Sequence, residues 1–206
     1  MRYLIMCGGD YHVDTPRQLW EINGEPIVKR TIRLLRENGV KDIAITSNDK
    51  RFKRFRVPVL NDDLNSFGNG GMWIEGFYPT MNPTCYIFGD VVFSPAAIKE
   101  IVETETDDIE FFASAPPFSA SYIKSWAEPF AFKVTNMVHF RQAKAETYGL
   151  NLAGRFAREP IAWELWQVIK ETPINVISYS NYHVINDYTC DVDSPKDLEK
   201  IREVLK

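Results

Sequence analysis

Apolar positions along the chain follow two patterns, short runs typical of strands and longer segments with helical spacing. The clearest helical segment is 27–38, where the apolar residues share one face and Gly39 follows as a stop signal. Strand patterns occupy 3–6, 42–46, 57–60, 85–88, 109–113, 128–134, 175–179 and 182–186. Further helical patterns occupy 95–102, 138–148, 161–170 and the segment that starts at 195, and residues 72–78 favour a helix start.

The alternation of strands and helices predicts crossover connections, and therefore an α/β fold with a mostly parallel central sheet. We expect helices on both faces of this sheet, in three α/β/α layers, because parallel strands are covered on both sides. In such sheets ligands bind at the carboxyl ends of the strands.

The second half of the chain alternates less regularly than the first, and the sequence holds no repeat, low-complexity tract or linker. We therefore expect one domain over 1–206, with a ligand-binding half of about 1–115 and a lid or acceptor half of about 116–206. The last helix has a clear start, because Ser194 is placed as N-cap, Pro195 at the first position and Asp197 as the partner of the cap.

Composition narrows the class of protein. The 206 residues are 45% hydrophobic and 25% charged, as in ordinary globular domains. A formal charge of -4 argues against a nucleic-acid partner, since binding to a phosphate backbone requires a basic excess. The start of the chain lacks the apolar length of a signal peptide, and no segment reaches membrane-spanning length, so we expect no membrane partner.

Three scattered cysteines do not form a disulfide framework or a zinc motif, and this favours the cytoplasm as the compartment. Cys7 and Cys190 lie near candidate site residues, but no base that would make either one a nucleophile is evident.

The first candidate for chemistry is "MCGGDYHVDTPRQL", in which a strand ends on Gly8-Gly9. A plain turn is the commoner meaning of such a pair. The alternative is a backbone whose N–H groups face an anion, with Arg17 downstream as a fixed charge that reaches phosphate.

The second candidate is Asp90, which follows Gly89 directly after the apolar run 85–88. It suits a turn or the cap of the next helix, and it also suits a Mg²⁺ ligand, because Mg²⁺ takes one or two carboxylates together with substrate phosphates.

The third candidate is "CDVDSPKDL" at 190–198. In an extended chain Asp191 and Asp193 point to the same side, and two like charges so close require a cation or hydrogen-bond donors. The three candidates together describe a glycine cradle, a basic residue, and carboxylates from two separate strand ends.

In this order, with "PRQLWEINGEPIVKRTI", "YIFGDVVF" and "CDVDSPKDLEKI", the sequence resembles the nucleotidyltransferases of GT-A-type fold. These include small cytidylyltransferases and sugar-phosphate nucleotidylyltransferases. The resemblance is strongest over 1–46, with anchors at 85–100 and 185–203, and leaves most of 103–180 unmatched. It implies a Mg²⁺-dependent transfer from an NTP, CTP first, to a small phosphorylated metabolite or sugar phosphate, with release of pyrophosphate. A role in making capsule or other cell-surface polysaccharide is also implied.

The resemblance assigns roles to particular residues. Arg17 takes the place of the phosphate-binding lysine of the family, and Lys133 falls near another lysine used on the phosphates; these two are the catalytic candidates. Asp90 and Asp193 match the metal-binding carboxylates, with Asp191 as neighbour or alternative. The nucleotide-binding candidates are Cys7, Gly8, Gly9, Arg17, Asn69, Gly70 and Gly71.

The first loop departs from the family pattern Gly-x-Gly-x-Arg, because it lacks the later glycine and that arginine. Arg17 and His12 are the candidates to replace the missing charge. Two alternatives therefore stay open. A GT-A-type glycosyltransferase would use a nucleotide sugar, although it usually carries two aspartates after the central strand and this chain has one. A catalytically silent nucleotide-binding domain is the other.

The less-matched half of the chain contains the aromatic residues Tyr122, Trp126, Trp163 and Trp166. Packing in the core is the commoner role of such residues, and a cage around a cationic head group such as choline is the alternative. A homodimer is left open by the sequence.

Overall fold

The computed structural model describes residues 1–8, 14–60, 72–114 and 127–206. Among these, a seven-stranded sheet has the order β10-β8-β9-β6-β1-β4-β5. Its strands are β1 (Arg2–Met6), β4 (Ile43–Thr46), β5 (Val59–Leu60), β6 (Thr84–Phe88), β8 (Ile109–Ser114), β9 (Pro129–Val134) and β10 (His183–Ile185). Only β9 runs antiparallel to its neighbours in this sheet. The predicted mostly parallel α/β sheet is confirmed.

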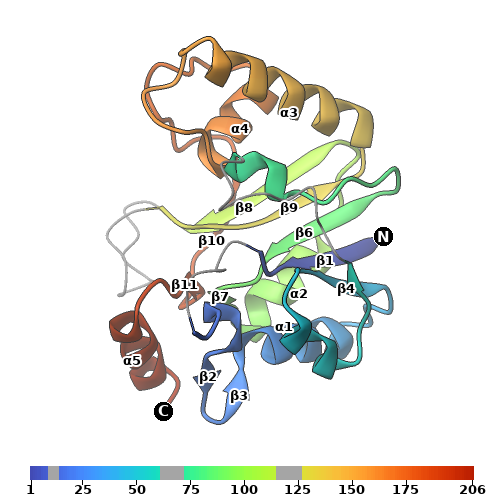
Figure 1. Ribbon diagram of the computed structural model, residues 1–206, viewed down its shortest axis with the longest axis vertical. Coiled ribbons are helices and arrows are strands. Elements are labelled where there is room, and N and C mark those ends of the chain that lie inside the picture. The colour runs from blue at the N-terminus through green and yellow to red at the C-terminus, as the bar shows by residue number, and fades with distance from the viewer. Residues whose placement is uncertain (9–13, 61–71, 115–126) are drawn as a thin grey trace.

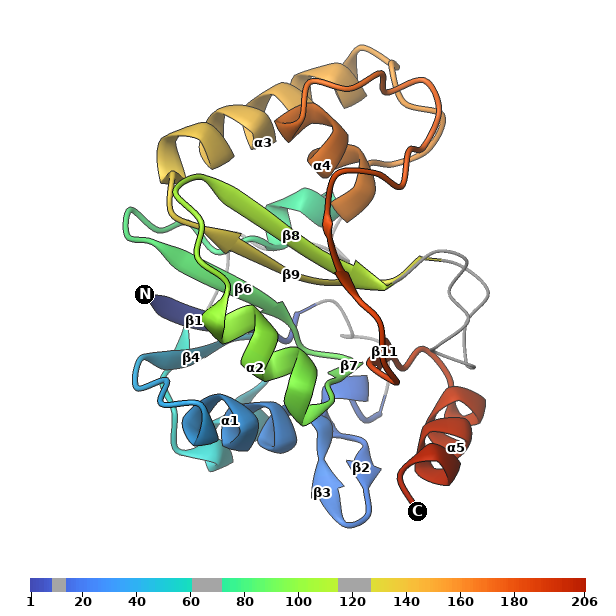
Figure 2. The same ribbon diagram turned by 180° about the vertical axis from the view of Figure 1, so that it is seen from behind.

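Helices cover both faces of the sheet. Figure 2 shows α1 (Ile27–Glu37) and α2 (Pro95–Glu103) in front of it, while α3 (Met137–Leu152) and α4 (Ala162–Ile169) lie at the top of the molecule in Figure 1. Phe140 of α3 stacks on Tyr86 of β6, with ring centroids 5.6 Å apart, whereas Lys133 of β9 reaches α2 on the opposite face. The three predicted layers are therefore present.

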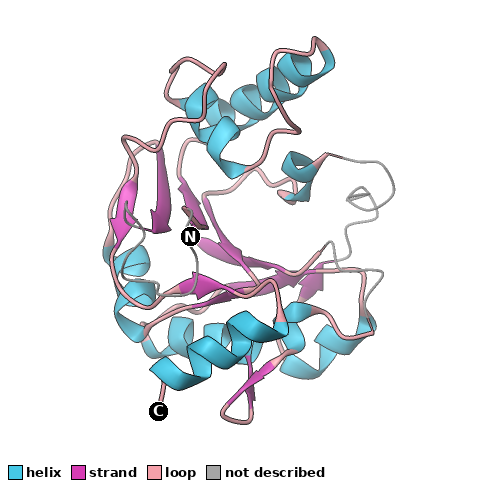
Figure 3. Ribbon diagram, turned by 90° about the vertical axis from the view of Figure 1, so that its left-hand side faces the viewer, coloured by secondary structure: helices cyan, strands magenta, loops and turns pink. Residues whose placement is uncertain are grey.

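The remaining elements are short. They are η1 (Arg17–Leu19), η2 (Lys50–Phe55) and η3 (Trp73–Gly76), the hairpin of β2 (Glu21–Ile22) and β3 (Glu25–Pro26), the ladder of β7 (Val91–Val92) with β11 (Cys190–Asp191), and α5 (Pro195–Val204). The C-terminus lies next to α5 at the lower end of the molecule, and the N-terminus lies at the sheet (Figure 3). The helix start expected within 72–78 is the single 3₁₀ turn η3.

The strand predicted at 175–179 is wrong. These residues form no strand, and Val176 is 69% exposed. Side chains of α4 bind this segment instead, because Gln167 Nε2 donates to the Val176 carbonyl at 2.9 Å and Trp166 Nε1 to the Ser180 carbonyl at 3.1 Å. With its backbone bonded to side chains, the segment is a connection that leads to β10.

One continuous core joins β1, β4, β6, β8 and β9 with the helices on either side. Its aromatic part surrounds Phe77, whose ring lies edge-on to Tyr86, Phe132 and Phe140 at 5.1, 5.5 and 5.2 Å. Such edge-to-face pairs add to the stabilisation from burial. Within the described part of the chain, no helix is long and apolar enough to cross a membrane.

Candidate functional site

The carboxyl ends of the neighbouring strands β6, β1 and β4 meet at one edge of the sheet, which we call the carboxyl edge. Met6 at the end of β1 is in register with Phe88 of β6 and with Thr46 of β4. Hydrogen bonds continue past the strands, from the Gly89 N–H to the Met6 carbonyl at 3.0 Å and from the Cys7 N–H to the Thr46 carbonyl at 2.9 Å. The segments after these strands therefore begin side by side, as the sequence predicted for Gly8 and Asp90.

Gly89 lets the end of β6 approach the end of β1. A Cβ at this position would lie 2.4 Å from the Met6 carbonyl oxygen and 2.7 Å from Cys7 Sγ. The buried side chain of Gln18 covers the same point, since its Cγ would be 3.1 Å from that Cβ. Glycine is needed here for space, and it fixes where Asp90 begins.

Asp90 and the C-terminal aspartates are brought together by the β7–β11 ladder. Asp191 is opposite Val91 in this ladder, and the Val192 N–H donates to the Asp90 carbonyl at 3.0 Å. The segment is also tied to the start of α2, because the Ser94 N–H donates to Thr189 Oγ1 at 3.0 Å. Residues about 100 positions apart in the sequence thus meet at the carboxyl edge.

The electrostatics of Asp90 reflect this convergence. Burial raises the pKa of the half-buried Asp90 carboxyl to about 7, and the nearby charges of Asp191 and Asp193 act in the same direction. Arg17 acts in the opposite direction and lowers it. An acidic group whose ionised form is disfavoured by burial and by like charges is one that a bound cation would stabilise.

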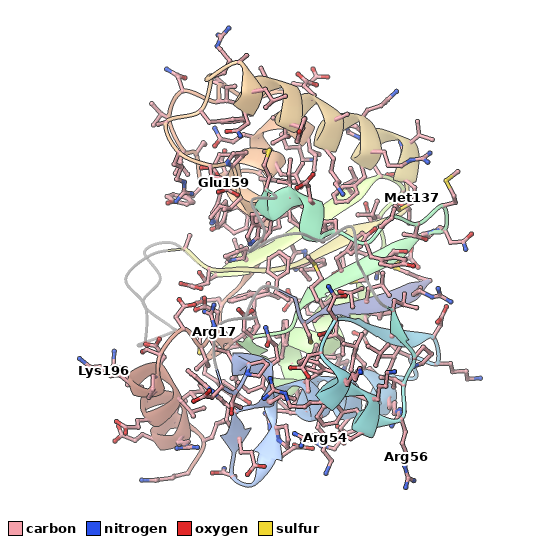
Figure 4. All side chains as sticks on the ribbon, viewed as in Figure 1. Arg17, Arg54, Arg56, Met137, Glu159 and Lys196 are labelled. Carbon is pink, nitrogen blue, oxygen red and sulfur yellow. The ribbon has the colours of Figure 1, made fainter. Side chains whose placement is uncertain are left out.

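Arg17 is the basic residue of this cluster. It lies in η1, directly after Pro16, and its Nη1 forms an ion pair with Asp193 Oδ1. In Figure 4 the label of Arg17 lies between the sheet and α5. Arg17 thus lies near carboxylates from two separate strand ends, as the sequence predicted.

The carboxylates of Asp90, Asp191 and Asp193 are of the chemical type that binds Mg²⁺. Carboxylate oxygens are its usual protein ligands, and it takes one or two of them with substrate phosphates completing the shell. Among the described residues, no group of three His, Cys, Asp or Glu side chains is arranged to hold a metal ion. Asp90 with Asp193 or Asp191 would therefore offer a partial shell, as a site shared with a phosphate substrate requires.

Asp197 is structural, as expected. Its N–H meets Ser194 Oγ at 3.3 Å while its carboxylate accepts from the Ser194 N–H at 3.0 Å, which completes the capping box of α5. This cap holds the segment that carries Asp193 at the start of α5.

Lys133 lies away from this cluster, which disagrees with its predicted role on the phosphates. It is opposite Cys85, near the amino end of β6, whereas Asp90 follows the carboxyl end of the same strand. Its Nζ donates to the carbonyls of Ile101, Val102 and Thr104 at 3.0, 2.9 and 2.5 Å. Lys133 is thus placed as a cap for the C-terminus of α2, because the last carbonyls of a helix lack partners within it.

The other predicted residues divide between described and undescribed positions. Cys7 is buried and Gly8 is exposed at the end of β1, on the carboxyl edge. Gly9, His12 and the candidates Asn69, Gly70 and Gly71 lie outside the described residues. Gly8 is therefore the part of the predicted cradle that can be placed.

Of the four aromatic residues named as candidates in the acceptor half, the two that can be placed lie in the core. Trp163 and Trp166 are 2% and 1% exposed, and their rings lie 4.9 and 5.5 Å from that of Phe111. Neither is available to a cationic head group. Tyr122 and Trp126 lie outside the described residues.

The sequence reading missed Gln18, which packs over Gly89 beside Arg17. Its side-chain oxygen is buried and accepts no hydrogen bond from the described residues. Its position directly after Arg17 was the available signal, but a glutamine in a short polar segment has no distinctive pattern.

Comparison with solved structures finds chains of the same fold. The chain is similar to a CTP:phosphocholine cytidylyltransferase from Streptococcus pneumoniae (LicC), with 15% identity, a TM-score of 0.55, and coverage of 100% of this chain and 98% of that one. It is similar to an inositol-1-phosphate CTP transferase from T. maritima, with 17% identity, a TM-score of 0.54, and coverage of 99% and 94%. HddC from Yersinia pseudotuberculosis, complexed with GMP-PN, gives 12% identity, a TM-score of 0.57, and coverage of 100% and 99%.

No protein-family model matches the sequence, and no curated protein matches it. The similarity to solved structures extends over the whole chain at low identity, and so it concerns the fold. The resemblance that the sequence suggested is confirmed at that level: the chain has the α/β fold of the nucleotidyltransferases.

Proposed function

We propose that this protein is a nucleotidyltransferase that joins an NTP to a small phosphorylated metabolite or sugar phosphate and releases pyrophosphate. The observation that carries the proposal is the convergence of Asp90, Asp191, Asp193 and Arg17 at the carboxyl edge. The shared fold supports it, because ligands of open α/β sheets bind outside the carboxyl ends of the strands.

The reaction is a displacement at phosphorus. An oxygen of the acceptor phosphate forms a bond to the α-phosphorus, the bond from that phosphorus to the bridging oxygen breaks, and its electron pair leaves with pyrophosphate. Such chemistry requires positioning and stabilisation of charge, with no covalent intermediate on the protein.

Arg17 has the chemistry to bind the phosphates. Its guanidinium is permanently charged and matches phosphate in geometry, and its present partner, Asp193, is 44% exposed at the side chain. A phosphate oxygen can replace the Asp193 carboxylate as the acceptor, which frees Asp193 for a metal ion. Gly8 is exposed and follows Cys7, whose Sγ lies near Gly89 together with the side chain of Gln18, the residue after Arg17.

Asp90 and Asp193 would hold Mg²⁺, with Asp191 as neighbour or alternative. Bound there, the ion would supply positive charge against the phosphate oxygens. Asp90 stays ionised more readily beside a divalent cation, since the cation offsets the burial and the like charges that raise its pKa.

CTP is the favoured nucleotide because of the similarity of this chain to solved structures of CTP-using enzymes. Of the three solved structures described above, two carry CTP in their names, one with phosphocholine and one with inositol-1-phosphate, whereas HddC is complexed with GMP-PN. A small phosphorylated acceptor follows from the same comparison.

Pyrophosphate release with a panel of NTPs and candidate phosphates tests the proposal. We expect release with one pair, and an Asp90→Asn variant that is at least about 100-fold slower. Asp42→Asn is the matched control, because Asp42 pairs with Arg2 before β4, at the opposite end of the strands.

Thermal shifts with the same nucleotides and Mg²⁺ separate two failures. Stabilisation by a nucleotide without any pyrophosphate release would indicate a silent nucleotide-binding domain. Release that is unchanged in Asp90→Asn would contradict the assignment of the metal site.

A further inference from the structure

A second guanidinium, that of Arg51, is held at the carboxyl edge beyond the end of β4, the strand next to β1. Arg51 lies in the first turn of η2, shortly after the end of β4. Its Nε donates to both carboxylate oxygens of Asp49, at 3.0 and 2.8 Å, and its Nη2 donates to Oδ2 at 2.5 Å. Asp49 also caps η2 through the Arg51 N–H at 2.8 Å. This fork sets the plane of the guanidinium.

Arg51 also contacts the first loop. Its Nη1 donates to the carbonyl of Asp14 at 2.5 Å, and Asp14 lies between Gly8 and Arg17 in the sequence. The contact joins segments 37 residues apart. Arg51 is thus held between the end of β4 and the segment that leads to Arg17.

The strand order gives the approximate spacing between the Asp90 side and the Arg51 side of the carboxyl edge. β1 lies between β6 and β4, and neighbouring strands are about 4.8 Å apart, so the ends of β6 and β4 are roughly 10 Å apart. A triphosphate chain that lies between these strand ends is within reach of side chains from both sides. Asp90 is at one side of it, Gly8 lies in the middle, and Arg51 is at the other side.

The acidic cluster at Asp90 offers little positive charge to a triphosphate, so further positive charge is required at the β4 side of the carboxyl edge. The cluster at Asp90 contains three carboxylates and one guanidinium, and Arg17 already pairs with Asp193. A guanidinium has five N–H donors, and the contacts of Arg51 within the described residues engage three of them. Its side chain is 45% exposed. Two donors of a charged and oriented group therefore remain for a ligand.

We propose that Arg51 binds the β- and γ-phosphates of the nucleotide, the part that leaves as pyrophosphate. This inference rests on the proposed function. When the acceptor oxygen bonds to the α-phosphorus and the bridging oxygen departs with the electron pair, negative charge grows on pyrophosphate, and Arg51 stabilises it. Asp49 is the positioning residue that keeps the guanidinium in place.

Binding measurements with phosphate chains test this without requiring the right base. Inorganic tripolyphosphate and pyrophosphate, each with Mg²⁺, are titrated into the full chain by calorimetry, together with a panel of nucleoside monophosphates. We expect Arg51→Gln to weaken binding of both phosphate chains about 10- to 100-fold, which is the loss expected for a charge-assisted hydrogen bond. Binding of the best monophosphate should change less than about twofold, because Arg51 does not contact the α-phosphate.

Arg54→Gln is the matched control. Arg54 belongs to the same basic 3₁₀ helix, its guanidinium lies 5.0 Å from the centre of the Phe55 ring, and it is far from Arg17 in Figure 4. This variant should bind the phosphate chains as the unaltered protein does. Arg51→Lys should recover part of the affinity, since it keeps the charge and loses the fork, and Asp49→Asn should give an intermediate loss.

Three results would overturn the inference. Phosphate-chain affinity that is unchanged in Arg51→Gln shows that Arg51 is not a ligand. Equal weakening of monophosphate and phosphate chains shows that Arg51 only shapes the loop. Equal weakening in Arg54→Gln shows that general surface charge attracts the anions. If the unaltered chain binds phosphate chains through Arg51 but releases no pyrophosphate from any NTP, the proposed function fails and the phosphate site stands.

Discussion

Arg17 and Lys133 are two cations at opposite ends of the same sheet, and both were expected to bind phosphate. Arg17 forms an ion pair with the carboxylate of Asp193, which is itself partly exposed. Lys133 is 7% exposed and donates to three backbone carbonyls at the C-terminal end of α2. A carboxylate partner can be exchanged for a phosphate, whereas three carbonyls at a helix end cannot leave without unwinding the helix. The difference lies in the partners, and the residue types do not reveal it.

The largest expected effect tests the Arg17 side of this comparison. Arg17→Gln should lower kcat/KM for pyrophosphate release by about 10²- to 10³-fold, because one charged donor to the reacting phosphates is lost. Steady-state kinetics measures it, and circular dichroism should show an unchanged fold. Arg2→Gln is the control, since Arg2 pairs with Asp42 on the surface. An effect of Arg17→Gln below twofold would remove Arg17 from the site.

The next effect concerns how the carboxyl edge is built. Gly89→Ala should lower the free energy of unfolding by about 3 kcal/mol, at the upper end of overpacking effects, because the new Cβ meets the Met6 carbonyl oxygen. Urea denaturation measures the loss. Gly149→Ala is the control, because no atom lies within 4 Å of a Cβ built there and alanine favours the interior of α3. Equal stability of both variants would mean that β6 and β1 separate easily at this point.

Lys133→Met tests the other side of the comparison. It should cost about 1–3 kcal/mol of unfolding free energy, since the carbonyls at the end of α2 lose their donor, while kcat/KM of the folded protein stays within about twofold. Lys99→Met is the matched control, because Lys99 lies on the exposed side of α2 and pairs only with Glu103 at 3.8 Å among its described ion pairs. A large loss of activity with unchanged stability would return Lys133 to the phosphates.

The smallest expected effect concerns how much the ionised Asp90 carboxylate lowers the free energy of unfolding. Burial, with nearby Asp191, raises the pKa of Asp90 to about 7, so between about pH 4 and 7 the folded chain binds a proton that the unfolded chain releases. Stability from this group therefore falls as pH rises through that window. Without metal at pH 8, Asp90→Asn should be more stable on the order of 1 kcal/mol, roughly 2–4 °C in Tm for this chain length.

Near pH 4 the two proteins should unfold at similar temperatures, because Asp90 is then protonated in the folded state. Scanning calorimetry in EDTA measures both conditions. A variant that is less stable at pH 8 would show that the ionised carboxylate is held by donors and needs no cation.

Much of the fold was predictable because it depends on local patterns. The helical face of 27–38, the apolar runs at 3–6 and 85–88, and the cap at Ser194 all act within a few residues. The segment 175–179 shows the limit, since its apolar pattern suits a strand but side chains of α4 bind its backbone. Whether an apolar run joins a sheet depends on a neighbouring strand with free backbone groups.

The sequence by itself determined the α/β class, the strand ends at Gly8 and Asp90, and the residue types of the proposed phosphate and metal site. Glycine spacing, carboxylates and helix caps have the same chemistry wherever they occur. The tertiary structure decided which charges share a place. The β7–β11 ladder places Asp90 beside Asp191 and Asp193. The packing of the sheet directs Lys133 toward α2 and brings Arg51 into contact with Asp14. Electrostatic interactions fall off with distance in space, and the packing of the sheet sets that distance.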